Sequence, residues 1–256
     1  MIDKRQVARR FSRAANEYDQ RAALQNQIGD RLLELIQPDW MGRLIDLGCG
    51  TGRLLKKLES RDRLILHGID LSPGMIDFAR QQTRAKLICG DIESTPYDDH
   101  SFDIAISNAA LQWCSLDSAF SEVRRLLIDG GRFAFTTFGA NTLNELRSVL
   151  QEIDPTRSHV HSFPDETMLR AALQRHGFSQ IKLAQEELFD IPQDPADLLQ
   201  NLRRIGAGYA GPAAGQHYFG RKKYQQLIDE LWNRYRMGSQ FGFTYDTFFV
   251  SCVATG

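Results

Sequence analysis

The chain has 256 residues, a formal net charge of −1, 42% hydrophobic residues and 25% charged residues. This length suits one large α/β domain, and the composition is that of an ordinary globular enzyme. The near-zero charge excludes global attraction to nucleic acid, no apolar run is long enough to cross a bilayer, and the N-terminus lacks the apolar core of a secretory signal. We therefore expect a cytoplasmic protein with no nucleic-acid or membrane partner. We also expect it to be a monomer.

The first part of the chain predicts helix and then a parallel sheet. Apolar residues recur at helical spacing over residues 3–36, in two pieces, and Pro38 ends this region. From residue 43, short apolar runs alternate with helical segments. The runs are "RLIDL", "LILHGID", "KLICGD", "FDIAISN" and "GRFAFTTF". Five such runs predict a parallel sheet that helices cover on both faces.

The rhythm changes after residue 140. Helices are predicted over 141–153, 164–177, about 194–204 and 221–236, and strands over 178–191 and 241–256. The two late strands predict an antiparallel hairpin at one edge of the sheet. The fold is therefore α/β with about seven strands, a parallel core and an antiparallel edge.

Three glycines alternate in "LIDLGCGTGRLL", directly after the first predicted strand: Gly48, Gly50 and Gly52. Glycines let backbone N–H groups approach a ligand closely, although a purely structural turn has the same composition. The dinucleotide fingerprint G-x-G-x-x-G places its third glycine one residue later. Asp46 adds a carboxylate that would repel a pyrophosphate and attract a cationic ligand.

Further polar residues follow the next strands. Asp70 ends the second strand, where a carboxylate can bind two ribose hydroxyls or, equally, belong to the cap of the helix that Ser72-Pro73 begins. Asp91 follows the third strand, and "SNAALQWC" follows the fourth. Ligands of such sheets bind beyond the carboxyl ends of the strands, where all these features fall. Trp113 is equally compatible with a place in the core.

In these features the chain resembles the class I S-adenosylmethionine (SAM)-dependent methyltransferases, which implies a Rossmann-like fold. The resemblance implies that Asp91 contacts the adenine amino group and that Ile92 lies on the ring. It also implies a methyl-transfer site beside Trp113 and no metal. The cofactor-binding residues are predicted to be Asp46, Gly48, Cys49, Gly50, Gly52, Asp70, Leu71, Asp91, Ile92, Asn108 and Gln112.

The two ends of the chain resemble one family more closely, the malonyl-[acyl-carrier-protein] methyltransferases of biotin synthesis. The resemblance rests on "VARRFSRAANEYDQRAALQ", "FGANTLNELR", "HVHSF", "LRRIGA" and "FTYDTFFVSC". It implies methyl transfer from SAM to the free carboxylate of a malonyl thioester on acyl carrier protein. It also implies one methyltransferase domain over 1–256, with a helical lid at 1–37, a SAM-binding core at 38–140, and a C-terminal half at 141–256 that carries a substrate cap around 192–220.

Three residues are predicted to act at the substrate: Tyr18, Arg147 and Trp113. Arg147 is the candidate for holding the malonyl carboxylate, because a carboxylate that enters a closed site must be paired. Tyr18 is the candidate for closing over the cofactor or donating a hydrogen bond to the substrate. His159 and His161 are candidates for the pocket lining. An ionised carboxylate needs no general base, so no catalytic triad is expected.

Acyl carrier proteins are small and acidic, so a basic docking surface is expected. Three clusters are candidates, although each alone is compatible with a solvated face. They are residues 1–13 (Lys4, Arg5, Arg9, Arg10 and Arg13 against the one acid Asp3), Arg203-Arg204, and Arg221-Lys222-Lys223. The N-terminal lid helix and the Gly206–Gly215 loop would need to move to admit the pantetheine arm.

Three other functions remain open from the sequence alone. The first is a small-molecule carboxyl methyltransferase of the trans-aconitate type, which shares "LQW" after the fourth strand. The second is a catalytically silent SAM-binding scaffold, against which the intact Asp46, Asp70 and Asp91 stand. The third, an NAD-dependent oxidoreductase, is disfavoured by the glycine spacing. The four cysteines contain no C-x-x-C pair and are predicted to be reduced thiols.

Overall fold

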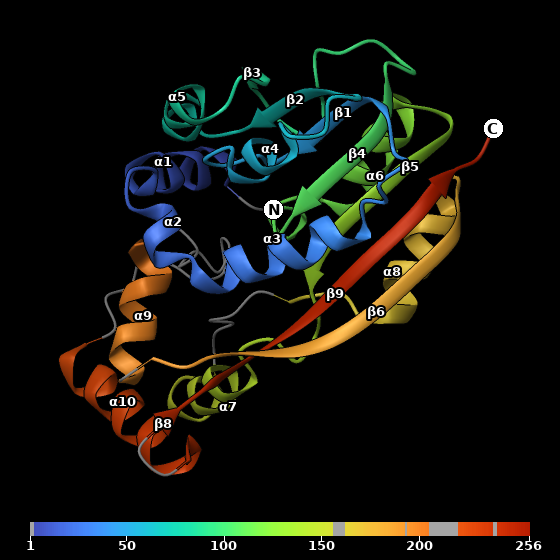
Figure 1. The fold of residues 1–256 in the computed structure, drawn as a ribbon. Coiled ribbons are helices and arrows are strands. Elements are labelled where there is room, and N and C mark those ends of the chain that lie inside the picture. The colour runs from blue at the N-terminus through green and yellow to red at the C-terminus, as the bar shows by residue number, and fades with distance from the viewer. Residues whose placement is uncertain (1–2, 156–161, 193, 205–219, 238–239) are drawn as a thin grey trace.

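A seven-stranded sheet forms the centre of the molecule (Figure 1). The computed structural model describes residues 3–155, 162–192, 194–204, 220–237 and 240–256. The strand order is β3-β2-β1-β4-β5-β9-β6, in which β1 to β5 are parallel and β9 runs antiparallel to both β5 and β6. The strands are β1 (Gly42–Leu47), β2 (Leu64–Asp70), β3 (Lys86–Cys89), β4 (Phe102–Asn108), β5 (Leu127–Phe138), β6 (Phe178–Asp190) and β9 (Phe243–Ala254). The predicted parallel core with an antiparallel edge is confirmed.

Helices cover both faces of the sheet. The described helices are α1 (Lys4–Ala14), α2 (Tyr18–Arg21), α3 (Ala23–Leu35), α4 (Arg53–Leu58), α5 (Pro73–Gln82), α6 (Leu116–Leu126), α7 (Asn144–Ile153), α8 (Glu166–Arg175), α9 (Pro195–Arg204), α10 (Arg221–Tyr235) and the single 3₁₀ turn η1 (Leu111–Trp113). Helices α3, α4 and α5 pack on one face, and α3 crosses β4 and β5 in Figure 1. Helices α6 and α8 pack on the other face over a core rich in phenylalanine. None of the helices described is both long and apolar enough to span a bilayer.

The structure adds details that the sequence patterns did not predict. The connection between β6 and β9 contains α9, α10 and a short two-stranded ribbon, β7 (Arg236–Met237) with β8 (Gln240–Phe241). Strand β9 therefore lies inside the sheet and β6 forms the edge. The N-terminal helical region is broken into three pieces instead of two, because the chain turns at residues 15–17 and again at Ala22. The predicted cap around 192–220 lies largely outside the described residues.

Helix α1 is fastened to the start of α5 near the carboxyl ends of β1 and β2 (Figure 1). The Ser12 hydroxyl lies 2.8 Å from the Ser72 hydroxyl and accepts a hydrogen bond from the Gly74 N–H at 3.2 Å. A Cβ on Gly74 would lie 2.7 Å from the Ser12 carbonyl oxygen, so glycine is needed for this close approach. These contacts place the N-terminal helix over the edge of the sheet where ligands of such folds bind.

His67 in β2 has a buried imidazole ring, which lies away from the ligand-binding edge of the sheet. Its ring contacts Tyr97 and Phe102 at centroid distances of 5.7 and 5.2 Å, and neither ring nitrogen has a hydrogen-bond partner among the described residues. Burial, with the nearby Arg43 and Lys86 charges, lowers the pKa of His67 to about 4. The neutral ring is therefore the folded form, while the unfolded chain takes up a proton below about pH 6.5.

We expect acid to destabilise the protein through this residue. Because the pKa of His67 is lower in the folded state, its contribution to the free energy of unfolding falls as pH drops through about 6.5 and levels off near 4. In His67→Phe the loss between about pH 7 and about pH 5 should be smaller by about 2 kcal/mol. Urea unfolding at the two pH values measures this difference. An unchanged pH slope would rule out His67 as the source.

Candidate active site

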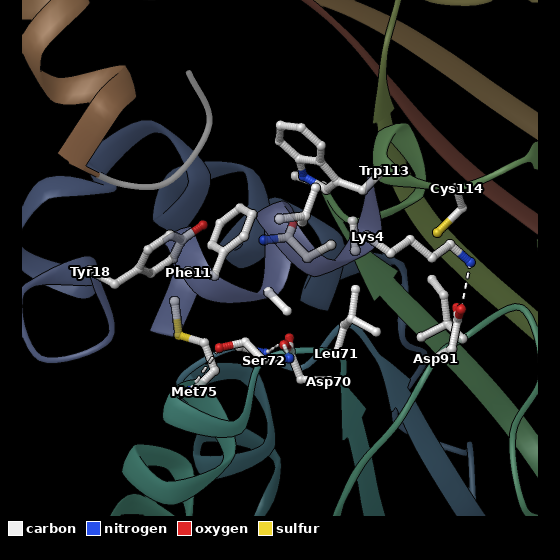
Figure 2. Close-up of a pocket in the computed structure, with 18 residues that line it drawn as sticks. Lys4, Phe11, Tyr18, Asp70, Leu71, Ser72, Met75, Asp91, Trp113 and Cys114 are labelled. Atoms are coloured by element: carbon white, nitrogen blue, oxygen red, sulfur yellow. Dashed lines mark hydrogen bonds and ion pairs between the residues drawn. The ribbon is translucent and has the colours of Figure 1, made fainter. Parts of the chain in front are cut away.

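A cavity of about 680 Å³, counted with its mouth, lies between α1 and the carboxyl ends of β1, β2 and β4 (Figure 2). The structure brings most of the predicted site residues to its wall. Those that line it are Tyr18, Gly48, Gly50, Asp70, Leu71, Asp91, Ile92, Asn108 and Trp113. A neighbouring hollow of about 430 Å³ shares Tyr18, Gly48, Gly50 and Asn108 with it and adds Asp46 and Cys49.

The glycine loop after β1 is folded against the end of β2. The N–H groups of Gly48 and Cys49 both donate to the Ile69 carbonyl, at 2.8 and 3.0 Å, and the Gly50 N–H donates to Asp70 Oδ2 at 2.9 Å. Three successive donors of the loop are thus occupied by the protein itself. The loop is therefore not an anion cradle of the P-loop type, in which free N–H groups surround a phosphate.

Asp70 is held in a fixed orientation at the cavity wall. One carboxylate oxygen accepts the Gly50 N–H and the other accepts the Ser72 N–H at 2.8 Å. Burial raises the pKa of Asp70, and the two backbone hydrogen bonds oppose this rise. Each oxygen has a further lone pair, so the carboxylate can accept two hydroxyl groups of a ligand that lies along the cavity.

Asp46 has a buried carboxyl group, one oxygen of which is available to a ligand. It is 1% exposed, and its Oδ1 has no hydrogen-bond partner among the described residues. Burial, together with the charge of Asp70, raises the pKa of Asp46 to about 8. Arg53 lines the same hollow, where its guanidinium also donates to Asp30 and to the Asn26 carbonyl. A hollow with a carboxylate and a guanidinium suits a zwitterionic amino-acid group.

Three aromatic rings meet at another part of the cavity wall, two from the N-terminal helices and one from the turn after β4. The Phe11 ring lies 6.1 Å from that of Tyr18 in a tilted arrangement and 5.7 Å from that of Trp113 in an edge-to-face arrangement (Figure 2). Asn108 lies in the same cavity, where its amide donates to the Gln25 carbonyl and its oxygen accepts from Thr136. Burial and the charges of Asp70 and Asp19 raise the pKa of Tyr18, so its hydroxyl stays protonated at neutral pH.

At the far end of the cavity, Asp91 forms an ion pair with α1. The Lys4 ammonium lies 2.6 Å from Asp91 Oδ2 (Figure 2). It also lies 2.9 Å from Glu93 Oε2. The sequence predicts that Lys4 belongs to a basic docking cluster, but in the structure its side chain lies at the cavity wall. Ile92 is buried beside Asp91 and presents an apolar surface to the cavity.

Three residues that were predicted to belong to the site line neither of these two cavities: Gly52, Gln112 and Arg147. Gly52 has a φ of +78° and begins α4, where a Cβ would lie 3.0 Å from Thr83. Gln112 folds back onto the Ala109 carbonyl. Arg147 is half-buried in α7 and donates to the Thr142 carbonyl at 3.3 Å. His159 and His161 lie outside the described residues.

The sequence patterns do not indicate that α1 contributes to the cavity. Lys4, Val7, Ala8 and Phe11 all line it, one helical turn apart. Their spacing predicts a helix with one buried face, but not what that face covers. Ser72, Met75, Ala109, Ala110 and Cys114 are not indicated either, since each is a neighbour of a motif residue with no chemical signal of its own.

Comparison with known proteins agrees with this geometry. Residues 45–135 match a family described as "Methyltransferase domain". The malonyl-[acyl-carrier protein] O-methyltransferase of Geobacter sulfurreducens is 36% identical over 89% of this chain and 90% of its own length. The chain belongs to the malonyl-[acyl-carrier protein] O-methyltransferase family. It is therefore a SAM-dependent O-methyltransferase.

Solved structures show that the family fold extends beyond these relatives. The YcgJ protein of Bacillus subtilis has a TM-score of 0.65 at 14% identity and covers 90% of this chain and 99% of its own. A phosphoethanolamine N-methyltransferase of Haemonchus contortus, solved with S-adenosylhomocysteine, has a TM-score of 0.57 at 19% identity over 90% of this chain and 53% of its own. These structural similarities support the assignment of the class I methyltransferase fold to this chain.

The site of this family member fits SAM on its own chemistry. The open Oδ1 of buried Asp46 suits an ammonium group, Asp70 suits ribose hydroxyls, and Ile92 suits the face of an adenine. The described residues contain no group of three or more His, Cys, Asp or Glu side chains arranged to hold a metal. When bound, SAM supplies an electrophilic methyl group on a sulfonium.

Protonation of Asp46 should make SAM affinity depend on pH. An ammonium beside Asp46 requires the carboxylate, so binding releases a proton wherever the free enzyme holds Asp46 protonated, below about pH 8. We expect the Kd for SAM to rise by up to about tenfold per pH unit as pH falls from about 8 to about 6. Asp46→Asn should bind more weakly and show a flat profile over this range. Calorimetric titration measures both, and equal slopes would contradict this role.

Proposed function

We propose that this enzyme transfers the methyl group of SAM to the free carboxylate of a malonyl thioester carried by an acyl carrier protein, a step of biotin synthesis. The observation that carries the proposal is the aromatic wall of the cavity. The Tyr18 hydroxyl and the neighbouring Cys114 thiol are protonated at neutral pH, since burial raises the pKa of Tyr18 and raises that of Cys114 to about 12. Neither of these two groups acts as a base, which suits a nucleophile that is already an anion.

The residues of the chain would act mainly by alignment. Asp46 and Asp70 would hold the amino-acid and ribose parts of the cofactor, which flank its sulfonium, while Phe11, Tyr18 and Trp113 line the cavity beside them. Aromatic faces favour a sulfonium through cation–π attraction and exclude water from the transfer. Tyr18 keeps its proton and can donate a hydrogen bond to the incoming carboxylate. Rate enhancement would come from the in-line approach of oxygen to methyl carbon in this dry cavity.

Arg147 is proposed to bind the malonyl carboxylate. It follows β5 at the edge of the sheet that also carries the cofactor loops, and its half-buried guanidinium is held by α7 and the Thr142 carbonyl. A bidentate arginine orients a carboxylate more precisely than a lysine does. Pairing also offsets the desolvation of the anion.

Arg147→Ala is expected to lower kcat/KM for the malonyl substrate by about 30-fold, the loss of one charge-assisted pair. The Kd for SAM should remain unchanged. Arg234→Ala is the control, because Arg234 pairs with Glu152 on the exposed side of α7 and α10 and should leave turnover unaltered. Steady-state kinetics test both variants, and normal turnover by Arg147→Ala would remove it from the site.

Substrate choice distinguishes the proposal from its rivals. Transfer of labelled methyl from SAM is compared on malonyl-carrier protein, acetyl-carrier protein and trans-aconitate. Label is expected on the malonyl form alone, because the acetyl form lacks the carboxylate. Label only on trans-aconitate would establish the small-molecule activity. No label on any acceptor, with SAM still bound, would indicate a silent scaffold.

A further inference from the structure

Helix α1 has two chemically different faces. Successive residues of an α-helix are rotated by roughly 100°, so positions 4, 7, 8 and 11 share one side and positions 5, 9 and 13 share the opposite side. The first set lines the cofactor cavity. The second set consists of Arg5, Arg9 and Arg13, and all three are exposed. We call these three residues the arginine stripe.

No described residue compensates the charge of the arginine stripe. Its three side chains form no ion pair or side-chain hydrogen bond with the part of the chain that the structure describes, whereas Lys4 of the same helix pairs with Asp91 and Glu93. Three arginines on one helix face, at positions 5, 9 and 13, make a positive surface about two turns long. Such a surface favours an acidic partner and speeds its association at low salt.

We propose that the arginine stripe is the docking surface for the acidic carrier protein. This inference rests on the proposed function, since it concerns how the same substrate is delivered. A carrier that docks on the outer face of α1 lies next to the cavity that its malonyl group must enter, because the inner face of that helix is the cavity wall. Docking and substrate entry are then organised by one helix.

The other basic clusters fit this role less well. The cluster on α10 begins at Arg221, and its Lys223 lies 3.8 Å from Asp154 and so is partly compensated. Helix α10 packs on α7 and α9 and contributes no described residue to the cavity wall. The side chains of Arg203 and Arg204 lie outside the described residues. A protein partner is favoured over a membrane, because no apolar residue lies among the stripe positions to enter a bilayer.

The position of the arginine stripe also links docking to the cofactor. Helix α1 reaches the cavity through Lys4 at Asp91 and reaches α5 through Ser12 at Ser72. A carrier bound to the stripe would hold these contacts in place while the thioester is in the site. The stripe residues themselves touch neither cavity, so their charge can be changed without removing a cofactor contact.

The test is the triple variant Arg5→Glu/Arg9→Glu/Arg13→Glu, assayed with malonyl-carrier protein and with malonyl-pantetheine, which has the same arm and no protein. The KM for malonyl-carrier protein should rise about tenfold or more, and its dependence on ionic strength should weaken. Turnover of malonyl-pantetheine and the Kd for SAM should match the wild type. The triple glutamine variant, which removes the charge without reversing it, should show a smaller rise in KM. It keeps the test valid if the glutamate variant misfolds. Circular dichroism checks the folding of both variants.

The matched control is Arg221→Glu/Lys222→Glu on α10, which should leave all these values unchanged. An unaltered KM in both stripe variants, or a rise only in the α10 variant, would overturn the docking surface. Stripe-dependent binding of duplex DNA or anionic vesicles with a normal carrier KM would overturn it too. If the wild type methylates neither malonyl substrate, the proposed function fails; if it methylates both and the stripe variants are normal, only the docking inference fails.

Discussion

Replacing Asp70 with asparagine is expected to raise the Kd for SAM by about 100-fold, close to 3 kcal/mol of lost binding. The carboxylate accepts the Gly50 and Ser72 N–H groups with its two oxygens and leaves further lone pairs for the ribose. An amide has one oxygen, so its NH₂ group must face either a backbone donor or a ligand hydroxyl. The variant thus loses both orientation and an acceptor. Isothermal titration calorimetry measures the change.

Asp77→Asn on α5 is the control for this substitution. Asp77 is exposed and pairs with Arg80 on the same helix, so its loss should leave SAM binding intact. If Asp70→Asn bound SAM as tightly as Asp77→Asn does, Asp70 would be only a structural link between the glycine loop and the next helix. That outcome would favour the alternative interpretation, in which Asp70 belongs to the cap of the helix that begins at Ser72-Pro73.

The second large effect is expected for Gly48→Ala. Gly48 has a φ of +79°, and a Cβ there would lie 2.4 Å from the Cβ of Ala110. Both residues belong to loops that line the cavity, so relief of this collision must widen or twist the cavity wall. We expect SAM affinity to fall by about 100-fold and the free energy of unfolding to fall by about 2 kcal/mol. Calorimetry and urea unfolding give the two values.

Gly130→Ala separates the collision from the backbone strain. Gly130 has a φ of +78°, nearly that of Gly48, but a Cβ there meets nothing within 4 Å. It should cost only the strain of a left-handed residue, about 1 kcal/mol, and leave SAM binding unchanged. Normal SAM binding by Gly48→Ala would show that the loop with Ala110 moves aside at little cost. The close contact between that loop and the glycine loop would then not be required for SAM binding.

The parts of the site that could be predicted are those that sit at the ends of strands. Asp46 is the second-last residue of β1, Asp70 ends β2 and Asp91 follows β3, and parallel strands bring their carboxyl ends to one edge. Local spacing therefore predicted their proximity. The glycine spacing and the acidic Asp46 excluded a pyrophosphate site, and the occupied N–H groups of the loop agree with that exclusion.

The remaining parts of the site, above all the contribution of α1, depend on packing between segments that are distant in the sequence. Nothing in the local pattern of residues 4–11 indicates that Lys4 would pair with Asp91 or that Phe11 would meet Trp113, more than eighty residues away in each case. Gly52 belongs to the same sequence motif as Gly48, yet it serves the start of α4, because the chain has already turned away from the cavity. Sequence spacing alone does not reveal which member of a motif faces the ligand.

The central claim concerns the acceptor of the methyl group. The most direct measurement is the intact mass of malonyl-carrier protein after incubation with the enzyme and SAM, followed by release of the pantetheine arm. Our account predicts a gain of one methylene, located on the released acyl group and absent when acetyl-carrier protein is used. A carrier of unchanged mass, or a gain that stays on the protein after the arm is released, would contradict it.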